Sequence, residues 1–271
     1  MSNKPSVAII GAGLTGLTCG TALQGMVDNV RIFEKDVFPG GRVGRFQAGE
    51  YEFNHGAQYF TVNNPLFWNI VSAWQSEGIV RPWDGWIVEL RRGHITNSDM
   101  STQRFVGAPC MATIVENLAR HCDLVTSTNI TELEHEESGG WRLFNERGDY
   151  QGLFDIVIVA TAANQAVELC RPVADIRRAA DHVDMTVCWS GMFAFERPLS
   201  LPYDAAFVLD SPLSWISRYH YGEQRPDADC WVLHATPEWS QQYVASFRGR
   251  VMNALLDAFW EATDLAVHKP A

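Results

Sequence analysis

The segment Val7–Gly16, with the sequence Val-Ala-Ile-Ile-Gly-Ala-Gly-Leu-Thr-Gly, decides how the N-terminal part of this chain folds. Its four apolar residues predict a strand, and the G-x-G-x-x-G pattern that follows is typical of a tight turn into a helix. Gly11 permits the turn, Gly13 lets backbone N–H groups approach a pyrophosphate, and Gly16 lets the helix pack closely on the strand. An ordinary glycine-rich loop is the alternative. We expect the helix N-terminus to face dinucleotide phosphates, with contacts from Gly11, Ala12, Gly13, Leu14, Thr15 and Gly16.

A second apolar stretch, Val30–Phe33, predicts a neighbouring strand that ends at Glu34. The distance from the glycines is about twenty residues, which is the spacing of the dinucleotide fingerprint. A carboxylate at this place can accept hydrogen bonds from both ribose hydroxyls, and Lys35 adjoins it. Strand, helix and acidic strand end together favour a dinucleotide site and leave NAD and FAD as the two choices.

The run Pro39–Arg45, Pro-Gly-Gly-Arg-Val-Gly-Arg, favours FAD over NAD. A glycine pair followed by an arginine suits a second approach to the pyrophosphate, and Gly41 and Arg42 are the candidates for it. The alternative for this run is a solvated basic turn.

Composition places the chain among globular proteins. It has 271 residues, 46% of them hydrophobic, which is enough for one large domain or two interleaved ones. The formal charge of −11 argues against a nucleic-acid or anionic-membrane surface. The first apolar run is short and interrupted by glycines, so neither a signal peptide nor a spanning helix is expected, and we expect a cytoplasmic protein.

No other catalytic or metal motif is present in the sequence. The six cysteines form no C-x-x-C pair and are expected to be reduced thiols. The eight histidines show no H-E-x-x-H arrangement, so no metal site is expected. A G-x-S-x-G nucleophile elbow is also absent.

The stretch His55–Thr61, His-Gly-Ala-Gln-Tyr-Phe-Thr, completes a family resemblance. Together with the glycine motif, Glu34 and the G-G-R-x-x-R run, it resembles the bacterial renalase-like flavoproteins, a branch of the FAD-dependent amine oxidase superfamily. The resemblance implies non-covalent FAD, with the flavin ring contacted by His55, Gly56, Ala57 and Gln58. It also implies backbone pairing of Ile130 with the adenine, and the strand end at Ala160 and Thr161 is expected close to the cofactor. The implied substrate pocket comprises His55, Gln58, Tyr59, Trp215, Tyr219 and His234.

The resemblance departs from the family at two places. Relatives tend to carry a small amide where this chain has Tyr219, which puts that substrate contact in doubt. Relatives also continue into a further segment with a closing strand and helix that support the flavin, whereas this sequence stops at Ala271. The expectation from this difference is a fragment, or an impaired flavin-fold protein that binds FAD weakly and needs a partner or second copy.

The expected architecture is α/β, a Rossmann-like FAD-binding domain with an interleaved, mainly antiparallel β substrate domain of the p-hydroxybenzoate hydroxylase and amine oxidase type. We expect residues 1–76 and 108–166 in the FAD domain, 77–107 and 167–238 in the substrate domain, and a helix in 239–271 that returns to the FAD domain. The hydrophobic pattern further predicts four elements: a core helix over 66–77, one strand over 124–133, a doubly covered strand over 154–162 and one long helix over 240–263.

The implied activity is oxidation of a reduced nicotinamide dinucleotide isomer, with hydride transfer to flavin and O2 as the final acceptor. Such a reaction needs stacking of two planar rings and no acid–base pair, so no catalytic residue is assigned. Amine oxidation is the alternative within enzymes, and a binding protein without turnover is the alternative outside them. The oligomeric state has no signature in the sequence.

Overall fold

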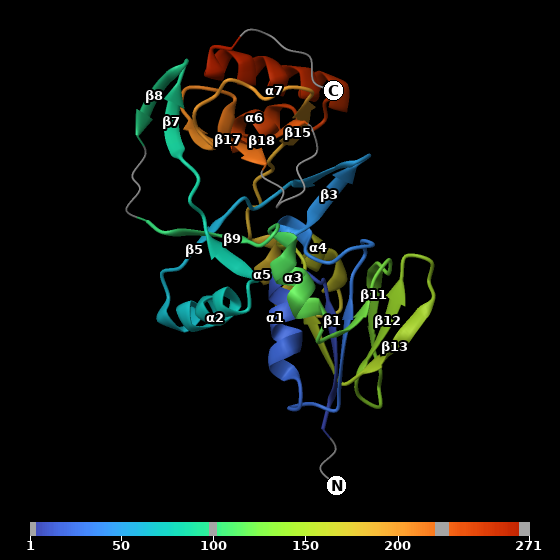
Figure 1. Cartoon of the computed structure of the whole chain (residues 1–271). Helices are drawn as coiled ribbons and strands as arrows, with labels where there is room; N and C mark the ends of the chain where they lie inside the picture. The colour runs from blue at the N-terminus through green and yellow to red at the C-terminus, as the bar shows by residue number, and fades with distance from the viewer. Residues whose placement is uncertain (1–3, 98–101, 220–227, 266–271) are drawn as a thin grey trace. The chain divides into compact units, whose positions relative to one another are not determined.

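The computed structural model describes residues 4–97, 102–219 and 228–265 and divides the chain into two compact units (Figure 1). Unit 1 comprises residues 1–44 and 114–185, and unit 2 comprises residues 45–113 and 186–271. Each unit is therefore built from two separate stretches of chain. This confirms the expected fold class, an α/β dinucleotide domain interleaved with a mainly antiparallel β domain.

The unit boundaries differ from the expected domain boundaries. Residues 167–185 were expected in the substrate domain and group with the dinucleotide unit. Residues 45–76, residues 108–113 and the C-terminal helix group with the antiparallel unit rather than with the dinucleotide unit. The reason is packing: Phe53 contributes to a buried cluster with Ala194, Cys230 and Val232 of the antiparallel sheet. The C-terminal helix likewise packs on strands of that same sheet.

Unit 1 is organised by a four-stranded, wholly parallel sheet. Its strand order is β10-β2-β1-β14, with bounds Asp123–Val125, Asn29–Phe33, Ser6–Ile10 and Ile156–Val159. The central strand β1 is nearly fully buried and continues into helix α1, Leu14–Leu23. Because all four strands run in one direction, their carboxyl ends lie at one edge, where ligands of such sheets bind.

The expected single strand over 124–133 is in fact two strands in two sheets. β10 ends at Val125, and β11, Ile130–His135, begins an antiparallel sheet with β12, Trp141–Asn145, and β13, Tyr150–Phe154. The chain reverses between them at Ser127, which has a positive φ of 52°. These three strands form an antiparallel meander, and in Figure 1 it lies beside β1 within unit 1.

The apolar run at 154–162 is also divided. β13 ends at Phe154, and Asp155 interrupts the strands by accepting hydrogen bonds from the backbone N–H and hydroxyl of Ser6, both at 2.7 Å. β14 is an edge strand of the parallel sheet, and Ile156 is 43% exposed, so the strand is not covered on both faces.

The remaining short helices are η1, Gly41–Val43, α3, Ala112–Ala119, α4, Ala163–Leu169, and α5, Ala174–Asp181.

Unit 2 is organised by a six-stranded sheet with the order β15-β18-β17-β16-β7-β8. The bounds are Ser190–Phe195, Asp229–Ala235, Leu213–Tyr219, Ala205–Val208, Ile87–Arg91 and His94–Asn97. All neighbours are antiparallel except β16 and β7. One face buries Phe193, Ile216, Trp231 and Leu233 in the largest core cluster of the described residues, together with helix α7, Arg248–Thr263. Figure 1 shows α6, Pro237–Gln242, and α7 over β15, β17 and β18.

The long helix predicted over 240–263 is broken between α6 and α7. Phe247 has an extended backbone (φ −63°, ψ 134°) at the start of α7, and its side chain is 82% exposed. The apolar stripe within α7 is as expected, because Val251, Leu255 and Phe259 are buried against the sheet.

Smaller elements complete unit 2. A hairpin pairs β3, Arg45–Ala48, with β4, Tyr51–Asn54, and a three-stranded sheet has the order β5-β9-β6, with bounds Phe60–Thr61, Arg104–Gly107 and Val80–Pro82. Helix α2, Pro65–Ser76, forms where the hydrophobic periodicity predicts it. Its apolar stripe is core only in part: Val71 is buried and Phe67 is half-buried against Phe60, whereas Leu66 is 76% exposed and Ile70 is 44% exposed.

Across the ranges 4–97, 102–219 and 228–265, no helix combines the length and apolar character required for crossing a membrane.

Candidate functional site

The carboxyl edge of the parallel sheet in unit 1 gathers most residues predicted to bind the cofactor. β1 leads into residues 11–16, β2 into Glu34 and Lys35, and β14 into Ala160 and Thr161. The chain is tied together there by backbone hydrogen bonds from Gly11 to Phe33, from Glu34 to Val125 and from Ala160 to Ile10, each at 2.8 Å. The sheet register therefore holds the three turns side by side.

Glu34 braces the first glycine turn. Its Oε2 accepts the backbone N–H of Ala12 at 2.8 Å, and its Oε1 accepts the backbone N–H of Asp36 at 3.0 Å. The side chain is only 6% exposed and Ala12 is fully buried. Each carboxylate oxygen has a second lone pair, so both can accept one further hydrogen bond. Lys35 is exposed and pairs with Asp36 at 3.2 Å.

Helix α1 begins directly at the turn and leaves its first backbone N–H groups available. Gly13 is the N-cap residue, no side chain within the described segments caps it, and the first turn carries no acidic residue. A Cβ added at Gly13 would meet no atom within 4 Å. A Cβ added at Gly16 would lie 2.0 Å from the carbonyl oxygen of Gly11, so only glycine allows the helix to start this close to the strand. Leu14 and Thr15 are exposed at the helix start.

The second glycine run lies against the first. Gly40 donates its N–H to the carbonyl of Ala12 at 2.9 Å and forms an isolated bridge with Gly13. Gly40 adopts φ 126°, and a Cβ there would lie 2.8 Å from the Cα of Gly44, so this position also requires glycine. Gly41 and Arg42 are exposed in the short helix η1 that follows. Two stretches separated by more than twenty residues thus lie side by side at the edge of the sheet.

Ala160, Thr161 and Ile130, which were also predicted to lie near the cofactor, do not share one location. Ala160 and Thr161 adjoin Gly11, because a Cβ at Gly11 would lie 3.1 Å from the Ala160 carbonyl and 3.3 Å from Thr161 Cγ2. Ile130 is 3% exposed, its side chain lies in the unit 1 core, and it stands opposite Asn145 in the β11–β12 ladder.

These residues fit a dinucleotide. A helix N-terminus with free N–H groups attracts phosphate, and open space at Gly13 lets a ligand come close to the backbone. The buried carboxylate of Glu34 retains acceptor capacity toward hydroxyls. A Cβ at Gly13 would occupy this space.

The predicted pocket residues all belong to unit 2 and lie along one face of the six-stranded sheet. Side chains alternate between faces of a strand, so Trp215, Ser217 and Tyr219 of β17 share the face opposite α7. The segment from Phe53 to Tyr59 packs on that face: Phe53 contacts Tyr219, Gln58 contacts Ser217 and Tyr59 contacts Trp215.

Gln58 is engaged by hydrogen bonds to its own segment and to the sheet. Its Nε2 donates to the carbonyls of Asn54 and of Gly56, the latter at 3.0 Å. Its Oε1 accepts the hydroxyl of Ser217 at 3.1 Å. Asn54 in turn accepts the backbone N–H of Met111 at 3.2 Å through Oδ1.

The carbonyl of His55 is held by two side chains from neighbouring strands. Ser190 Oγ donates to it at 2.7 Å, and His234 Nε2 donates to it at 3.1 Å. A carbonyl only accepts, so Nε2 of His234 carries the hydrogen. Burial lowers the pKa of His234 from its ordinary value, and the neutral imidazole is the favoured form. We call His55, Gln58, Ser190, Ser217 and His234 the sheet-face cluster.

Tyr59 and Trp215 belong to a group of aromatic rings rather than to the hydrogen-bonded cluster. The centroid of Tyr59 lies 5.5 Å from that of Trp215 and 5.6 Å from that of Trp83. The guanidinium of Arg104 lies over Tyr59 at 5.4 Å. Gly56 and Ala57 are half-buried between these two groups in the chain. Tyr219 stands apart from both and packs on Phe53 at 6.0 Å.

Sequence reasoning missed Ser190 and Ser217. Both side chains lie on the sheet face that packs against the 53–59 segment. Ser217 lies midway between Trp215 and Tyr219, which were predicted as pocket residues, and alternate residues of a strand share one face of the sheet. This alternation therefore predicts that Ser217 faces the same side. Ser190 carries no comparable signal, because its role depends on the pairing of β15 with β18.

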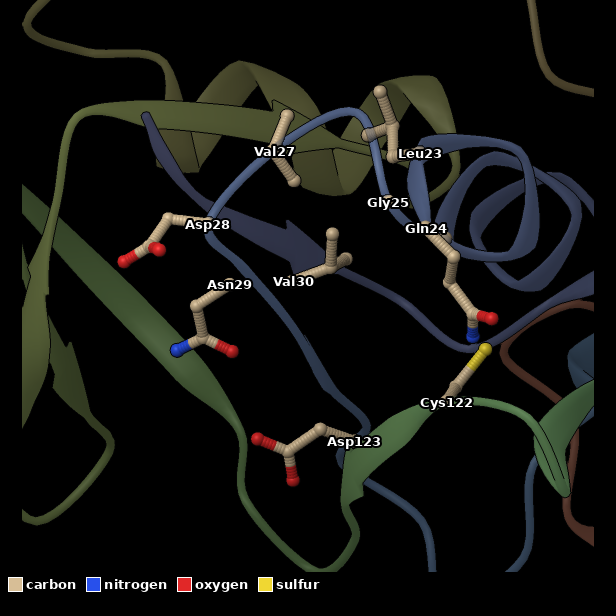
Figure 2. A pocket seen from close by; sticks show the side chains of 10 residues that line it. Leu23, Gln24, Gly25, Val27, Asp28, Asn29, Val30, Cys122 and Asp123 are labelled. Carbon is tan, nitrogen blue, oxygen red and sulfur yellow. The ribbon is translucent and has the colours of Figure 1, made fainter. Parts of the chain in front are cut away.

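A cavity of about 170 Å³ in unit 1 lies at the opposite edge of the parallel sheet from the glycine turns. Figure 2 shows lining side chains from the end of α1, the turn before β2 and the start of β10, among them Gln24, Asp28, Cys122 and Asp123. None of the predicted site residues lines it. Within the described residues, the cavity included, no group of three His, Cys, Asp or Glu side chains is arranged to hold a metal ion. None of the six cysteines forms a disulfide in the described structure.

The fold and the turns at the sheet edge define a Rossmann-type dinucleotide-binding protein. A family model described as an NAD(P)-binding Rossmann-like domain matches residues 9–74, which include both glycine runs and the His55–Thr61 stretch.

The chain is similar in structure to several solved proteins, two of which are described as oxidases. Putrescine oxidase bound to putrescine matches with a TM-score of 0.72 at 13% identity, over 98% of this chain and 84% of that chain. A candidate protoporphyrinogen oxidase from Exiguobacterium sp. matches with a TM-score of 0.75 at 11% identity, over 99% and 85%. A protein from Pyrococcus furiosus matches with a TM-score of 0.62 at 11% identity, over 89% and 84%. The chain therefore has the fold of the FAD-dependent amine oxidases.

Proposed function

We propose that this chain binds FAD at the carboxyl edge of the unit 1 sheet. The observation that carries the proposal is the buried Glu34 carboxylate beside a helix N-terminus with open space at Gly13. In this proposal residues 11–16 and Gly41 approach the pyrophosphate, Arg42 adds positive charge, and Glu34 accepts the ribose hydroxyls. The second glycine run is the feature that favours FAD over NAD in this proposal.

For unit 2 the proposal follows the sequence resemblance. His55, Gly56, Ala57 and Gln58 would supply the segment that faces the isoalloxazine. The ring of Tyr59 would provide a flat contact area, which suits a planar substrate ring, and Trp215, which is only 6% exposed, packs against Tyr59. His234 and Tyr219 complete the proposed pocket.

The proposed reaction is oxidation of a reduced nicotinamide dinucleotide isomer. Bound FAD supplies a hydride acceptor that O2 reoxidises, with hydrogen peroxide as the product. The contribution of this chain is to stack and orient the dihydropyridine and to exclude water, and it needs no proton transfer from a side chain.

Amine oxidation is the second candidate function. It is favoured by the similarity in fold to putrescine oxidase, whose solved structure contains putrescine. The identity of 13% leaves the substrate open, so the two activities must be separated by experiment.

Gly13→Ala tests the cofactor proposal, and Thr18→Ala on the exposed side of α1 is the control. The added methyl at Gly13 meets no protein atom, so the cofactor-free fold is expected to be unchanged. FAD binding, measured by titration of flavin fluorescence, should weaken at least about 10-fold in Gly13→Ala and stay unchanged in Thr18→Ala. A wild-type protein that binds NAD and takes up no FAD would overturn the assignment.

Stopped-flow mixing of the flavin-loaded protein separates the candidate reactions. Dihydronicotinamide dinucleotide isomers are expected to bleach the flavin absorption rapidly, whereas putrescine and simple amines should leave it unchanged. Rapid bleaching by amines alone would establish the second candidate. Stoichiometric FAD with inertness toward both classes would instead identify a flavin-binding protein without these activities.

A further inference from the structure

The segment from Asn54 to Tyr59 is anchored to the unit 2 sheet mainly through side chains that were expected to touch substrate. Gln58 and His234 were both predicted as pocket residues. In the structure both atoms of the Gln58 amide and the Nε2 atom of His234 bond to the protein itself: to the carbonyls of Asn54, Gly56 and His55, and to the hydroxyl of Ser217.

The amide of Gln58 is nearly saturated by these contacts. An amide side chain has two N–H donors, and both are directed to carbonyl oxygens of its own segment. Its Oε1 accepts the Ser217 hydroxyl, and Ser217 is only 2% exposed. A ligand that accepted a hydrogen bond from Nε2 of Gln58 would leave a backbone carbonyl without its donor. A ligand that replaced Ser217 at Oε1 would leave a buried hydroxyl without its acceptor, and both losses are unfavourable.

The carbonyl of His55 is saturated in the same way. Its two lone pairs face Ser190 Oγ at 2.7 Å and His234 Nε2 at 3.1 Å. Ser190 and His234 stand directly opposite each other in the β15–β18 register, so the two donors converge from adjacent strands. The segment is thereby held at both ends, at His55 by β15 and β18 and at Gln58 by β17.

We propose that Gln58 and His234 are positioning residues that hold the 54–59 segment in one conformation against the sheet, and that neither the Gln58 amide nor Nε2 of His234 is a hydrogen-bonding partner of the substrate. This inference rests on the proposed function for its consequence in catalysis, because the held segment is the one assigned to the flavin ring. The anchoring itself can be tested without any cofactor.

Gln58→Glu and Ser217→Ala are the informative substitutions. The carboxylate introduced by Gln58→Glu has no N–H donor and would face the carbonyl oxygens of Asn54 and Gly56, which repel it. Ser217→Ala removes a single hydrogen bond and keeps the strand. Gln47→Glu is the matched control, because Gln47 is an exposed glutamine that also donates to a nearby carbonyl, that of Gly49 at 3.2 Å.

Amide hydrogen exchange of the cofactor-free protein, followed by mass spectrometry, measures the anchoring directly. Peptides covering residues 54–59 should exchange about 5-fold faster in Ser217→Ala and faster still in Gln58→Glu, and at the wild-type rate in Gln47→Glu. Unchanged exchange in both variants would overturn the proposal. If Gln58→Glu fails to fold, Ser217→Ala alone decides the matter.

The flavin-loaded protein provides the second measurement. Loosening of the segment should shift the absorption maximum of bound flavin and slow flavin reduction in Ser217→Ala, while KM for the dihydronicotinamide dinucleotide changes less than about twofold. A Gln58 variant with normal hydrogen exchange and a strongly raised KM would show that Gln58 contacts substrate and would overturn the inference. Failure of the wild-type protein to take up FAD contradicts the proposed function, whereas the exchange result still decides the anchoring.

Discussion

The carboxylate of Glu34 accepts the backbone N–H of Ala12 at 2.8 Å, so the end of β2 and the turn after β1 are joined by a buried hydrogen bond. Twenty-two residues separate the two in sequence. Glu34 therefore has a structural role in the cofactor-free protein, in addition to the ribose contact that is proposed for it. The two roles lead to separate expectations.

Glu34→Ala is expected to destabilise the protein even without a ligand. The fully buried N–H of Ala12 would lose its acceptor, which costs about 1–3 kcal/mol of unfolding free energy. Urea denaturation of the cofactor-free protein measures this loss. Asp36→Ala is the control, because that side chain is exposed and its backbone N–H remains in place. If only FAD affinity fell and stability did not, the bracing role would be refuted.

Gly16→Ala is expected to lower the stability of the cofactor-free protein, whereas Gly13→Ala is expected to affect FAD binding alone. The methyl at Gly16 would overlap the carbonyl of Gly11 at 2.0 Å, so α1 must move, at a cost of about 1–3 kcal/mol or more in unfolding free energy. Gly13→Ala should retain wild-type stability and lose FAD. Thermal unfolding of the cofactor-free variants, with flavin titration beside it, checks the pair. Equal stability of the two variants would contradict the close packing of α1 on β1.

His234 should make stability depend on pH. Burial lowers its pKa in the folded state below its unfolded value of about 6.5, so the unfolded chain binds the proton more readily. Its contribution is therefore fully present above about pH 6.5 and is lost as pH falls through the unfolded and then the folded pKa. His234→Gln keeps a donor and removes the titration. Unfolding free energies measured between pH 8 and pH 5 should fall less steeply in this variant, and parallel curves would contradict the assignment.

The carboxylate of Asp229 is expected to be a main stabilising group of unit 2. Its Oδ2 accepts the backbone N–H of Leu199 at 2.8 Å and the indole N–H of Trp231 at 3.0 Å. Its Oδ1 forms an ion pair with Arg218 Nε at 2.9 Å. Asp229→Ala leaves Arg218 and two N–H groups without this partner and should cost about 3–5 kcal/mol of unfolding free energy.

Asp210→Ala is the control for that measurement. Asp210 also pairs with an arginine, Arg91, at 3.4 Å, but both side chains are about 60% exposed. An exposed pair contributes about 0–1 kcal/mol. Equal destabilisation by the two substitutions in urea denaturation would mean that burial does not set the strength of these pairs.

Several elements followed from local sequence, and several did not. The strand, turn and helix of residues 6–23 were predicted correctly. The strand over 124–133 and the helix over 240–263 were predicted as single elements, and each is broken. The first break, residues 126–129, has the polar sequence Thr-Ser-Thr-Asn, which is a turn signal that the single-strand prediction overlooked. Apolar residues continue across the second break, so periodicity alone cannot show where that helix is interrupted. The exposed positions Leu66 and Ile70 likewise carry the pattern of a core helix.

The sequence by itself determined the glycine turn, the acidic end of β2 and the second glycine run, because their backbone demands restrict which residues can stand there. Gly16 and Gly40 are such positions, since an added Cβ would overlap backbone atoms at both. Only the tertiary structure decided which partners the polar side chains take. Gln58 and Ser217 are 159 residues apart and meet because the 53–59 segment packs on one face of β17. The contact depends on how the strands of the sheet pair and on which face each side chain occupies. Both depend on many contacts between residues distant in sequence, so no local sequence pattern predicts the contact.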